Sequence, residues 1–141
     1  MELKTFYDLV DMINDHDLPK IRSVLTDDHV LADSCGNVFT GKDIASKVWK
    51  TWFDNCPDLS LEIRDIFRKP GSIAAFGFAG GTIQKDNHHN RYHKSPCGFK
   101  AIFREGMVKS WHMTGESLPG FRLMAFPFYN TKDENRSIIR L

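Results

Sequence analysis

The residue best suited to chemistry in this sequence is Asp33, within the stretch HVLADSCG at residues 29–36. Side chains alternate between the two faces of a strand, so His29, Leu31 and Asp33 share one face. If the aromatic residues that follow fold over this face, Asp33 lies at the mouth of an apolar pocket. Burial there raises the pKa of a carboxyl group and suits it to proton transfer. The alternative is a structural Asp33 that accepts hydrogen bonds from the turn at residues 34–36.

Three other polar residues near this strand, or on a later one, are weaker candidates for catalysis. His29 is the better second candidate because it shares the face of Asp33. His112 lies between two large apolar residues on a predicted strand, and if those residues point inward, His112 points outward. Cys35 follows Asp33 closely, but its thiol has no evident base to activate it. We therefore predict Asp33 and His29 as the catalytic residues.

A second group of polar residues resembles a list of metal ligands, namely Asp86, His88, His89 and His93. They fall in or beside the polar run 85–90, which we predict to be a hairpin loop. Side chains in such a loop need not converge, and their spacing matches no zinc motif. We predict a solvated loop here, no metal site and no cofactor.

Composition excludes several classes of function. The chain has 141 residues, which predicts one domain, and its 41% hydrophobic and 26% charged residues are typical of a globular protein. A net charge of +1 gives no electrostatic basis for binding nucleic acid or an anionic membrane. No apolar run approaches the roughly 20 residues of a membrane span, and the acidic N-terminal segment does not resemble a signal peptide. Three scattered cysteines predict free thiols in a reducing, cytoplasmic setting.

Apolar residues recur at helical spacing in the first part of the chain. They predict helices over residues 2–15 and 18–25, and a third from about residue 41 to residue 55. Asp17 is the expected N-cap of the second helix and Thr40 of the third. The third helix has an apolar face formed by Ile44, Val48, Trp49, Trp52 and Phe53.

The pattern changes to alternation from residue 59 onward. It predicts strands at about 59–64, 73–83, 91–104 and 107–116, joined by turns. Long strands joined by tight hairpins form an antiparallel sheet, and a sheet that follows helices gives an α+β fold. Residues 117–141 are broken by prolines and are predicted to be a C-terminal extension that packs on the domain or on a partner subunit.

Three segments in this order resemble the nuclear transport factor two-like superfamily, and within it the SnoaL-like group of polyketide cyclases and ketosteroid isomerases. They are INDHDLPKIRSVLTDDHVLADSCG at 13–36, TGKDIASKVWKTWFDNCPDLSLEI at 40–63 and PCGFKAIFREGMVKSWHM at 96–113. The resemblance implies a cone-shaped domain over residues 1–116. Its curved antiparallel sheet would be mixed at one edge, and N-terminal helices would enclose an apolar pocket. It also implies a homodimer formed through the outer face of the sheet.

The resemblance extends to individual positions. Asp33 falls where ketosteroid isomerases have their general base. The two oxyanion donors of that family fall at about Leu9 and Phe99, which donate no hydrogen bond, so steroid isomerisation by that route is not expected. The residues predicted to line the pocket and bind the ligand are Trp49, Phe53, Phe76, Phe78, Phe99, Phe103, Trp111 and Met113.

Two functions fit these observations. The first is a cofactor-independent isomerase, cyclase or dehydratase that acts on a small hydrophobic carbonyl compound with Asp33 as the proton shuttle. The second is a non-catalytic ligand-binding or dimerisation module of the same fold. The missing oxyanion donors favour the second function, and an acid in an aromatic pocket favours the first.

Overall fold

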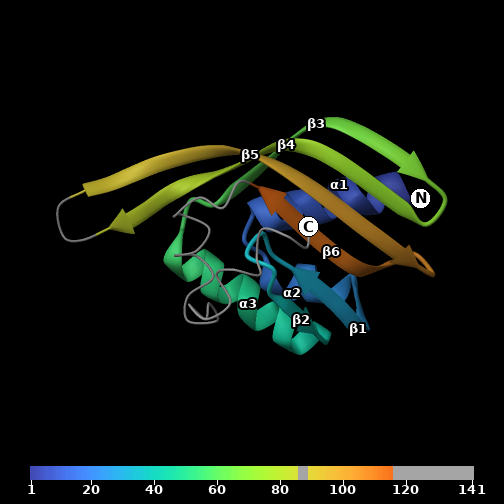
Figure 1. Ribbon diagram of the computed structural model, residues 1–141. Helices are drawn as coiled ribbons and strands as arrows, with labels where there is room; N and C mark the ends of the chain where they lie inside the picture. Colours follow the sequence, from blue (N-terminus) through green and yellow to red (C-terminus); the bar gives the residue numbers. More distant parts are fainter. Residues whose placement is uncertain (86–88, 116–141) are drawn as a thin grey trace.

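The computed structural model describes residues 1–85 and 89–115. The helices and strands in these ranges follow one another as α1 (Glu2–Asn14), α2 (Leu18–Ser23), β1 (Leu25–Ala32), β2 (Val38–Thr40), α3 (Lys42–Asn55), β3 (Ser60–Lys69), β4 (Ser72–Lys85), β5 (His89–Arg104) and β6 (Met107–Gly115) (Figure 1). The predicted α+β class is confirmed. The C-terminal extension predicted at 117–141 lies outside the described residues.

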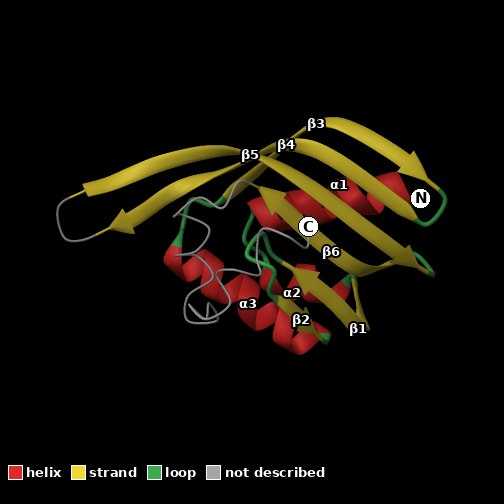
Figure 2. Ribbon diagram, viewed as in Figure 1, coloured by secondary structure: helices red, strands yellow, loops and turns green. Residues whose placement is uncertain are grey.

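The strands form one curved, unclosed sheet in the order β2-β1-β6-β5-β4-β3. All neighbouring strands run antiparallel except β1 and β6, which run parallel, so the predicted sheet, mixed at one edge, is confirmed. The three helices lie on the same side of the sheet (Figure 2). Because β1 pairs with β6, the strand that leads into Asp33 lies beside the last described strand of the chain.

The predicted first helix, residues 2–15, is confirmed as α1, and its apolar stripe faces the core. Its buried residues are Phe6, Leu9, Val10 and Ile13. The second helix also begins as predicted, because the Asp17 carboxylate accepts a hydrogen bond of 3.1 Å from the backbone N–H of Lys20. It ends at Ser23, earlier than predicted, since Leu25 already belongs to β1. Within the described ranges, no helix is both long enough and apolar enough to cross a bilayer.

The start and the inner face of α3 differ from the prediction. Thr40 is the last residue of β2, and the N-cap is Gly41, whose φ of 99° favours glycine. Thr40 is therefore not the cap. The helix buries its two tryptophans as predicted, but Ile44 is 48% exposed and Ala45 takes its place in the core.

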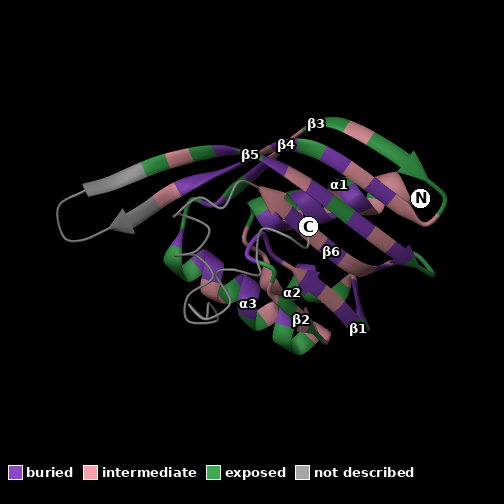
Figure 3. Ribbon diagram, viewed as in Figure 1, coloured by how far each residue is buried: buried purple, intermediate pink, exposed green. Residues whose placement is uncertain are grey.

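The pairing of the strands decides which aromatic residues point inward. Phe99 on β5 lies opposite Ala75 on β4 and Met113 on β6, and all three are buried on the inner face. Alternation along β4 then turns Phe76 and Phe78 to the outer face, which Figure 3 shows as alternating buried and exposed bands. The predicted inward orientation of Phe76 and Phe78 is wrong. The inner face of β4 carries small residues instead, and α1 packs against this part of the sheet.

β3 and β4 approach each other closely at Gly77. A Cβ atom on Gly77 would lie 1.8 Å from the backbone oxygen of Glu62, so glycine is required here. The pairing of β3 with β4 also shifts register between Ile63 and Asp65, as in a β-bulge. These features confirm that glycine in this strand allows close backbone contact.

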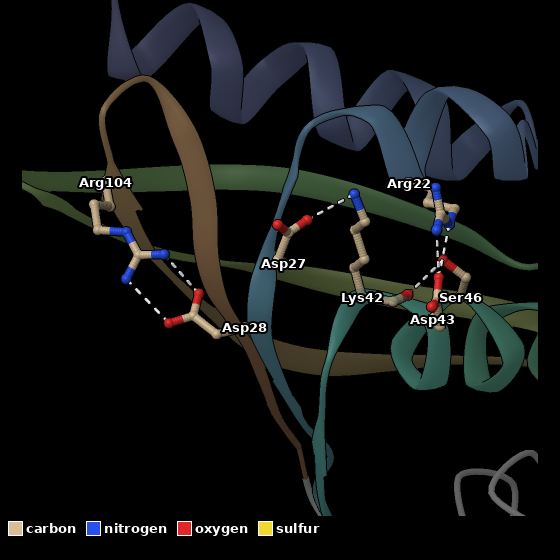
Figure 4. A network of polar contacts seen from close by, with 7 residues as sticks. All are labelled: Arg22, Asp27, Asp28, Lys42, Asp43, Ser46 and Arg104. Carbon is tan, nitrogen blue, oxygen red and sulfur yellow. Dashed lines mark hydrogen bonds and ion pairs between the residues drawn. The ribbon is translucent and has the colours of Figure 1, made fainter.

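Ion pairs hold the first part of β1 against its neighbours (Figure 4). Arg104 at the end of β5 donates two hydrogen bonds to Asp28, of 2.7 and 3.0 Å. These bonds lower the pKa of Asp28 to about 2. On the other side, the Lys42 ammonium lies 2.8 Å from Asp27. The pairs link β1 to α3 and to the end of β5, and because they are exposed each contributes little stability.

Candidate functional site

Asp33 follows the last residue of β1 and begins a tight turn. Its Oδ1 accepts hydrogen bonds from the backbone N–H groups of Cys35 and Asn37, both at 2.9 Å. Its Oδ2 accepts one bond of 3.0 Å from the side-chain amide of Asn37. The residue is only 4% exposed. The side chain therefore holds the turn together, as the structural alternative expected, while it is also buried.

Burial raises the pKa of Asp33, because a charged carboxylate loses solvation inside the protein. The bonds from Asn37 and Cys35 and the nearby His112 oppose this effect but do not cancel it. The predicted direction of the pKa shift is confirmed. Asp33 is thus a stronger base than an exposed aspartate.

Asp33 lines a small internal cavity between the turn, the C-terminal half of α3 and the inner face of the sheet. The free space amounts to about 10 Å³, room for about one water molecule. Its lining residues are Asp33, Ser34, Trp52, Leu59, Leu61, Ala79 and Met113. Apart from Asp33, Ser34 and the indole nitrogen of Trp52, the side chains of this wall carry no hydrogen-bonding N–H or O–H group.

Two polar atoms of the cavity wall lack partners. The Ser34 hydroxyl and the Trp52 indole nitrogen are buried, and neither has a hydrogen-bond partner among the described residues. Ser34 is 3% exposed and Trp52 is 4% exposed. Buried donors of this kind are normally satisfied, so each one needs an explanation.

The predicted ligand-binding residues divide into three groups. Met113 lines the cavity beside Asp33. Five others are buried on the inner side but pack against one another and do not line it: Trp49, Phe53, Phe99, Phe103 and Trp111. The rings fill the interior of the cone. Their role in binding a ligand remains a prediction.

The third group, Phe76 and Phe78, lies on the outer face. Phe76 is 57% exposed, and its ring makes an edge contact with Phe67 at 6.1 Å between centroids. The Phe78 ring lies beneath the cations of Arg64 and Lys94, at 5.6 and 4.9 Å. Neither ring reaches the cavity.

His29 is completely buried on the same face of β1 as Asp33. One ring nitrogen, Nδ1, lies 2.8 Å from the backbone oxygen of Val108, and burial lowers the pKa of the ring. His29 does not belong to the cavity wall. Its part in proton transfer therefore remains a prediction.

The remaining polar candidates do not join the site. His112 lies on the opposite face of β6 from Met113 and is half-buried, and burial lowers its pKa. Cys35 is buried in the turn. Of the four residues weighed as metal ligands, Asp86 and His88 lie outside the described residues. Within residues 1–85 and 89–115, no three His, Cys, Asp or Glu side chains are grouped to hold a metal ion.

Sequence reasoning missed Ser34 and Trp52 as site residues. Ser34 directly follows Asp33, and Trp52 lies one helical turn after Trp49 on the inner face of α3. The spacing assigned Trp52 to the core correctly. It did not indicate that the indole N–H would lack a partner, because this depends on which atoms of the sheet lie opposite.

Comparison with known proteins identifies the fold. A family model described as a SnoaL-like domain matches residues 5–111. A search of curated proteins finds no match.

Solved structures with the same fold are numerous. A Shewanella putrefaciens CN-32 protein assigned as a SnoaL-like polyketide cyclase has 10% identity and a TM-score of 0.74, with 82% of this chain and 79% of that chain covered. A Catenulispora acidiphila protein with a ketosteroid isomerase-like fold, in complex with trimethylamine, has 13% identity and a TM-score of 0.73, with 86% and 91% covered. TerC, co-crystallised with polyporic acid, has 11% identity and a TM-score of 0.72, with 87% and 97% covered. At these identities the similarity shows the fold alone.

Proposed function

This chain belongs to the family of SnoaL-like domains, and on that premise we propose that it binds a small hydrophobic carbonyl compound and moves a proton with Asp33. The reaction class is that of a cofactor-independent isomerase, cyclase or dehydratase. The observation that carries the proposal is the buried Asp33 carboxyl, which has a raised pKa and lines a mostly apolar cavity. A raised pKa brings a carboxylate closer to the basicity that efficient proton transfer requires.

The proton transfer begins with the Asp33 carboxylate next to a carbon that carries the ligand's carbonyl group. The C–H bond breaks, and its proton forms an O–H bond with Asp33. The electron pair of the C–H bond becomes the C=C bond of an enolate, and the carbonyl electron pair moves to oxygen. Return of the proton to another carbon completes an isomerisation. If the proton on Asp33 is first replaced by a deuteron from heavy water, return of that deuteron to the same carbon completes an exchange. Asp33 ends in the state in which it began.

The comparisons support a ligand-binding role at the level of the fold. Relatives in fold include the complexes with trimethylamine and with polyporic acid, but the same fold hosts unrelated activities. A ligand larger than water requires more than the 10 Å³ of free space beside Asp33. Met113 is the side chain expected to move aside, because methionine is unbranched and flexible.

The experiment follows the exchange of carbon-bound protons for deuterium. β-Tetralone, an apolar ketone with acidic protons next to its carbonyl, is incubated with the protein in heavy water, and proton NMR measures the rate of exchange. We expect the wild-type protein to accelerate the exchange and Asp33→Asn to lose this acceleration by about 10²–10⁴-fold.

Asp15→Asn is the matched control, because Asp15 is an exposed aspartate at the end of α1. It should exchange β-tetralone protons at the wild-type rate. Circular dichroism checks that each variant is folded. Equal rates for the wild type and a folded Asp33→Asn would remove Asp33 from the reaction and leave a binding module as the better description.

A second function, dimerisation, is favoured by the exposed rings of Phe67 and Phe76 on the outer face of the sheet. They are 60% and 57% exposed and contact each other. We propose that a second copy of the chain covers this face, as the resemblance implies. Analytical ultracentrifugation tests it: the wild type should sediment as a dimer at micromolar concentration and Phe76→Ser as a monomer. A wild-type protein that is monomeric throughout would contradict the dimer.

A further inference from the structure

The cavity beside Asp33 has the composition of a site for one oxygen atom. Two of its lining residues, Trp52 and Ser34, carry buried donors that have no partner among the described residues, and a third, Asp33, carries an acceptor. Its free volume of about 10 Å³ corresponds to about one water molecule. A buried water normally makes two to four hydrogen bonds, so the number of polar groups also fits.

The hydrogen-bonding capacity of the three groups is complementary. The indole nitrogen of Trp52 can only donate, whereas the hydroxyl of Ser34 can donate and accept. Asp33 accepts two bonds at Oδ1 but only one among the described residues at Oδ2, so Oδ2 retains capacity for a further donor. An oxygen atom within hydrogen-bond reach of both donors would give each of them the acceptor that it lacks among the described residues.

We propose that Trp52 and Ser34 form an oxygen-binding subsite, which holds a water molecule in the free protein and the carbonyl or enol oxygen of the ligand in the complex. The inference rests on the proposed function, because it assigns the ligand's reacting group to the cavity next to Asp33. It also replaces the oxyanion donors that the sequence lacks at Leu9 and Phe99. When Asp33 removes the neighbouring carbon-bound proton, negative charge develops on this oxygen, and both donors stabilise it.

The subsite narrows the class of ligand. A group that only donates hydrogen bonds, such as an ammonium, would leave the indole of Trp52 unpaired and is disfavoured. A ketone, an enol or a phenol presents an oxygen that accepts from both donors. The apolar wall formed by Leu59, Leu61 and Ala79 is suited to the hydrocarbon next to that oxygen.

The first measurement tests the water. Proton–nitrogen NMR spectra of protein labelled at its three tryptophan indoles report each N–H group separately. We expect the Trp52 indole proton to show a nuclear Overhauser effect to a long-lived water. The Trp111 indole provides an internal comparison and should show no such effect, because it is also buried without a partner among the described residues but lies outside the cavity wall. Addition of β-tetralone should remove the water signal and move the Trp52 resonance downfield.

The second measurement removes one hydrogen-bond donor at a time with little change in the shape of the side chain. Benzothienylalanine at position 52 replaces the indole N–H with sulfur, and Ser34→Ala removes the hydroxyl. Each change should weaken β-tetralone binding about two- to tenfold, the effect of one net hydrogen bond. The benzothienylalanine protein should also lose about 10²–10³-fold in the proton exchange rate.

The outcomes separate the two proposals. Absence of the water signal and of the ligand-induced shift at Trp52, with wild-type binding in both altered proteins, would overturn the subsite even if exchange still depends on Asp33. Water and ligand signals at Trp52 without Asp33-dependent exchange would support the subsite and overturn the proposed reaction.

Discussion

Removal of the Asp33 carboxyl tests its structural role separately from its chemistry. Asp33→Asn retains one carbonyl oxygen, which can accept the two backbone bonds now made by Oδ1. The Asn37 amide must turn over to present its oxygen to the new amide group. Asp33→Ala retains none of these acceptors. The two variants therefore differ mainly in the bonds to the backbone N–H groups of Cys35 and Asn37.

The surroundings of these two N–H groups determine how much the two variants differ in their free energy of unfolding. The N–H of Cys35 is buried, and a buried donor left without a partner costs about 1–3 kcal/mol. The N–H of Asn37 is partly buried, and loss of an ordinary hydrogen bond costs about 0.5–1.5 kcal/mol. We therefore expect Asp33→Ala to have a free energy of unfolding about 1.5–4.5 kcal/mol below that of Asp33→Asn.

Urea unfolding followed by circular dichroism measures this difference. The same pair of changes at the exposed Asp15 is the control and should differ by less than about 0.5 kcal/mol. Equal stability of Asp33→Ala and Asp33→Asn would refute the argument that the carboxyl holds the turn.

The pH dependence of the free energy of unfolding gives a second test of the role of Asp33. Because burial raises the pKa of Asp33 above the ordinary value of 3.8, the folded protein binds this proton more tightly than the unfolded chain does. The resulting stabilisation is fully present below pH 3.8 and is lost as the pH rises through the folded-state pKa. The stability of the wild type relative to Asp33→Asn should therefore fall with rising pH over this range, and a rise would contradict a raised pKa.

Three further predictions concern the scaffold. Burial lowers the pKa of His29 below 6.5. In urea unfolding, the wild type should therefore lose stability relative to His29→Asn as the pH falls through 6.5. The same dependence of unfolding free energy on pH in both proteins would contradict this. Gly77→Ala should lower the free energy of unfolding by about 3 kcal/mol or more, because the new Cβ would overlap a backbone oxygen of β3. Gly71→Ala, at a position with a φ of 81° and open space around it, should lower it by only about 1–2 kcal/mol. Comparable melting temperatures of the two variants would contradict this difference. Burial raises the pKa of Cys56 to about 11 and of Cys97 to about 12, so both thiols should resist a disulfide reagent at pH 8 until urea unfolds the protein.

Local patterns predicted the elements that position the site. Helical spacing located α1 and α3, and alternation located the strands from β3 to β6. Alternation along β1 also placed His29 and Asp33 correctly on one buried face. These features follow from residues close together in the sequence, which is why the sequence alone could predict them.

Features that depend on distant residues were not predictable in the same way. The resemblance assigns Phe76 to the pocket, whereas the pairing of Ala75 with the buried Phe99 turns Phe76 to the outer face. Within the described part of the chain the Trp52 N–H has no partner, and this depends on which atoms of the sheet lie opposite α3. Helix spacing identifies the buried face, but it does not reveal a missing hydrogen-bond partner.

The parallel pairing of β1 with β6 also determines when the Asp33 site can assemble during synthesis. Residue Leu31 is made early, but its partner Trp111 emerges from the ribosome only after nearly all of the described chain. Until then β1 has only β2, and an isolated two-stranded ribbon is marginal in water. Pairing over so long a sequence separation is also slow. The cavity next to Asp33, whose wall includes Met113 of β6, therefore cannot form before β6 has been made, and any chain that ends before β6 lacks it.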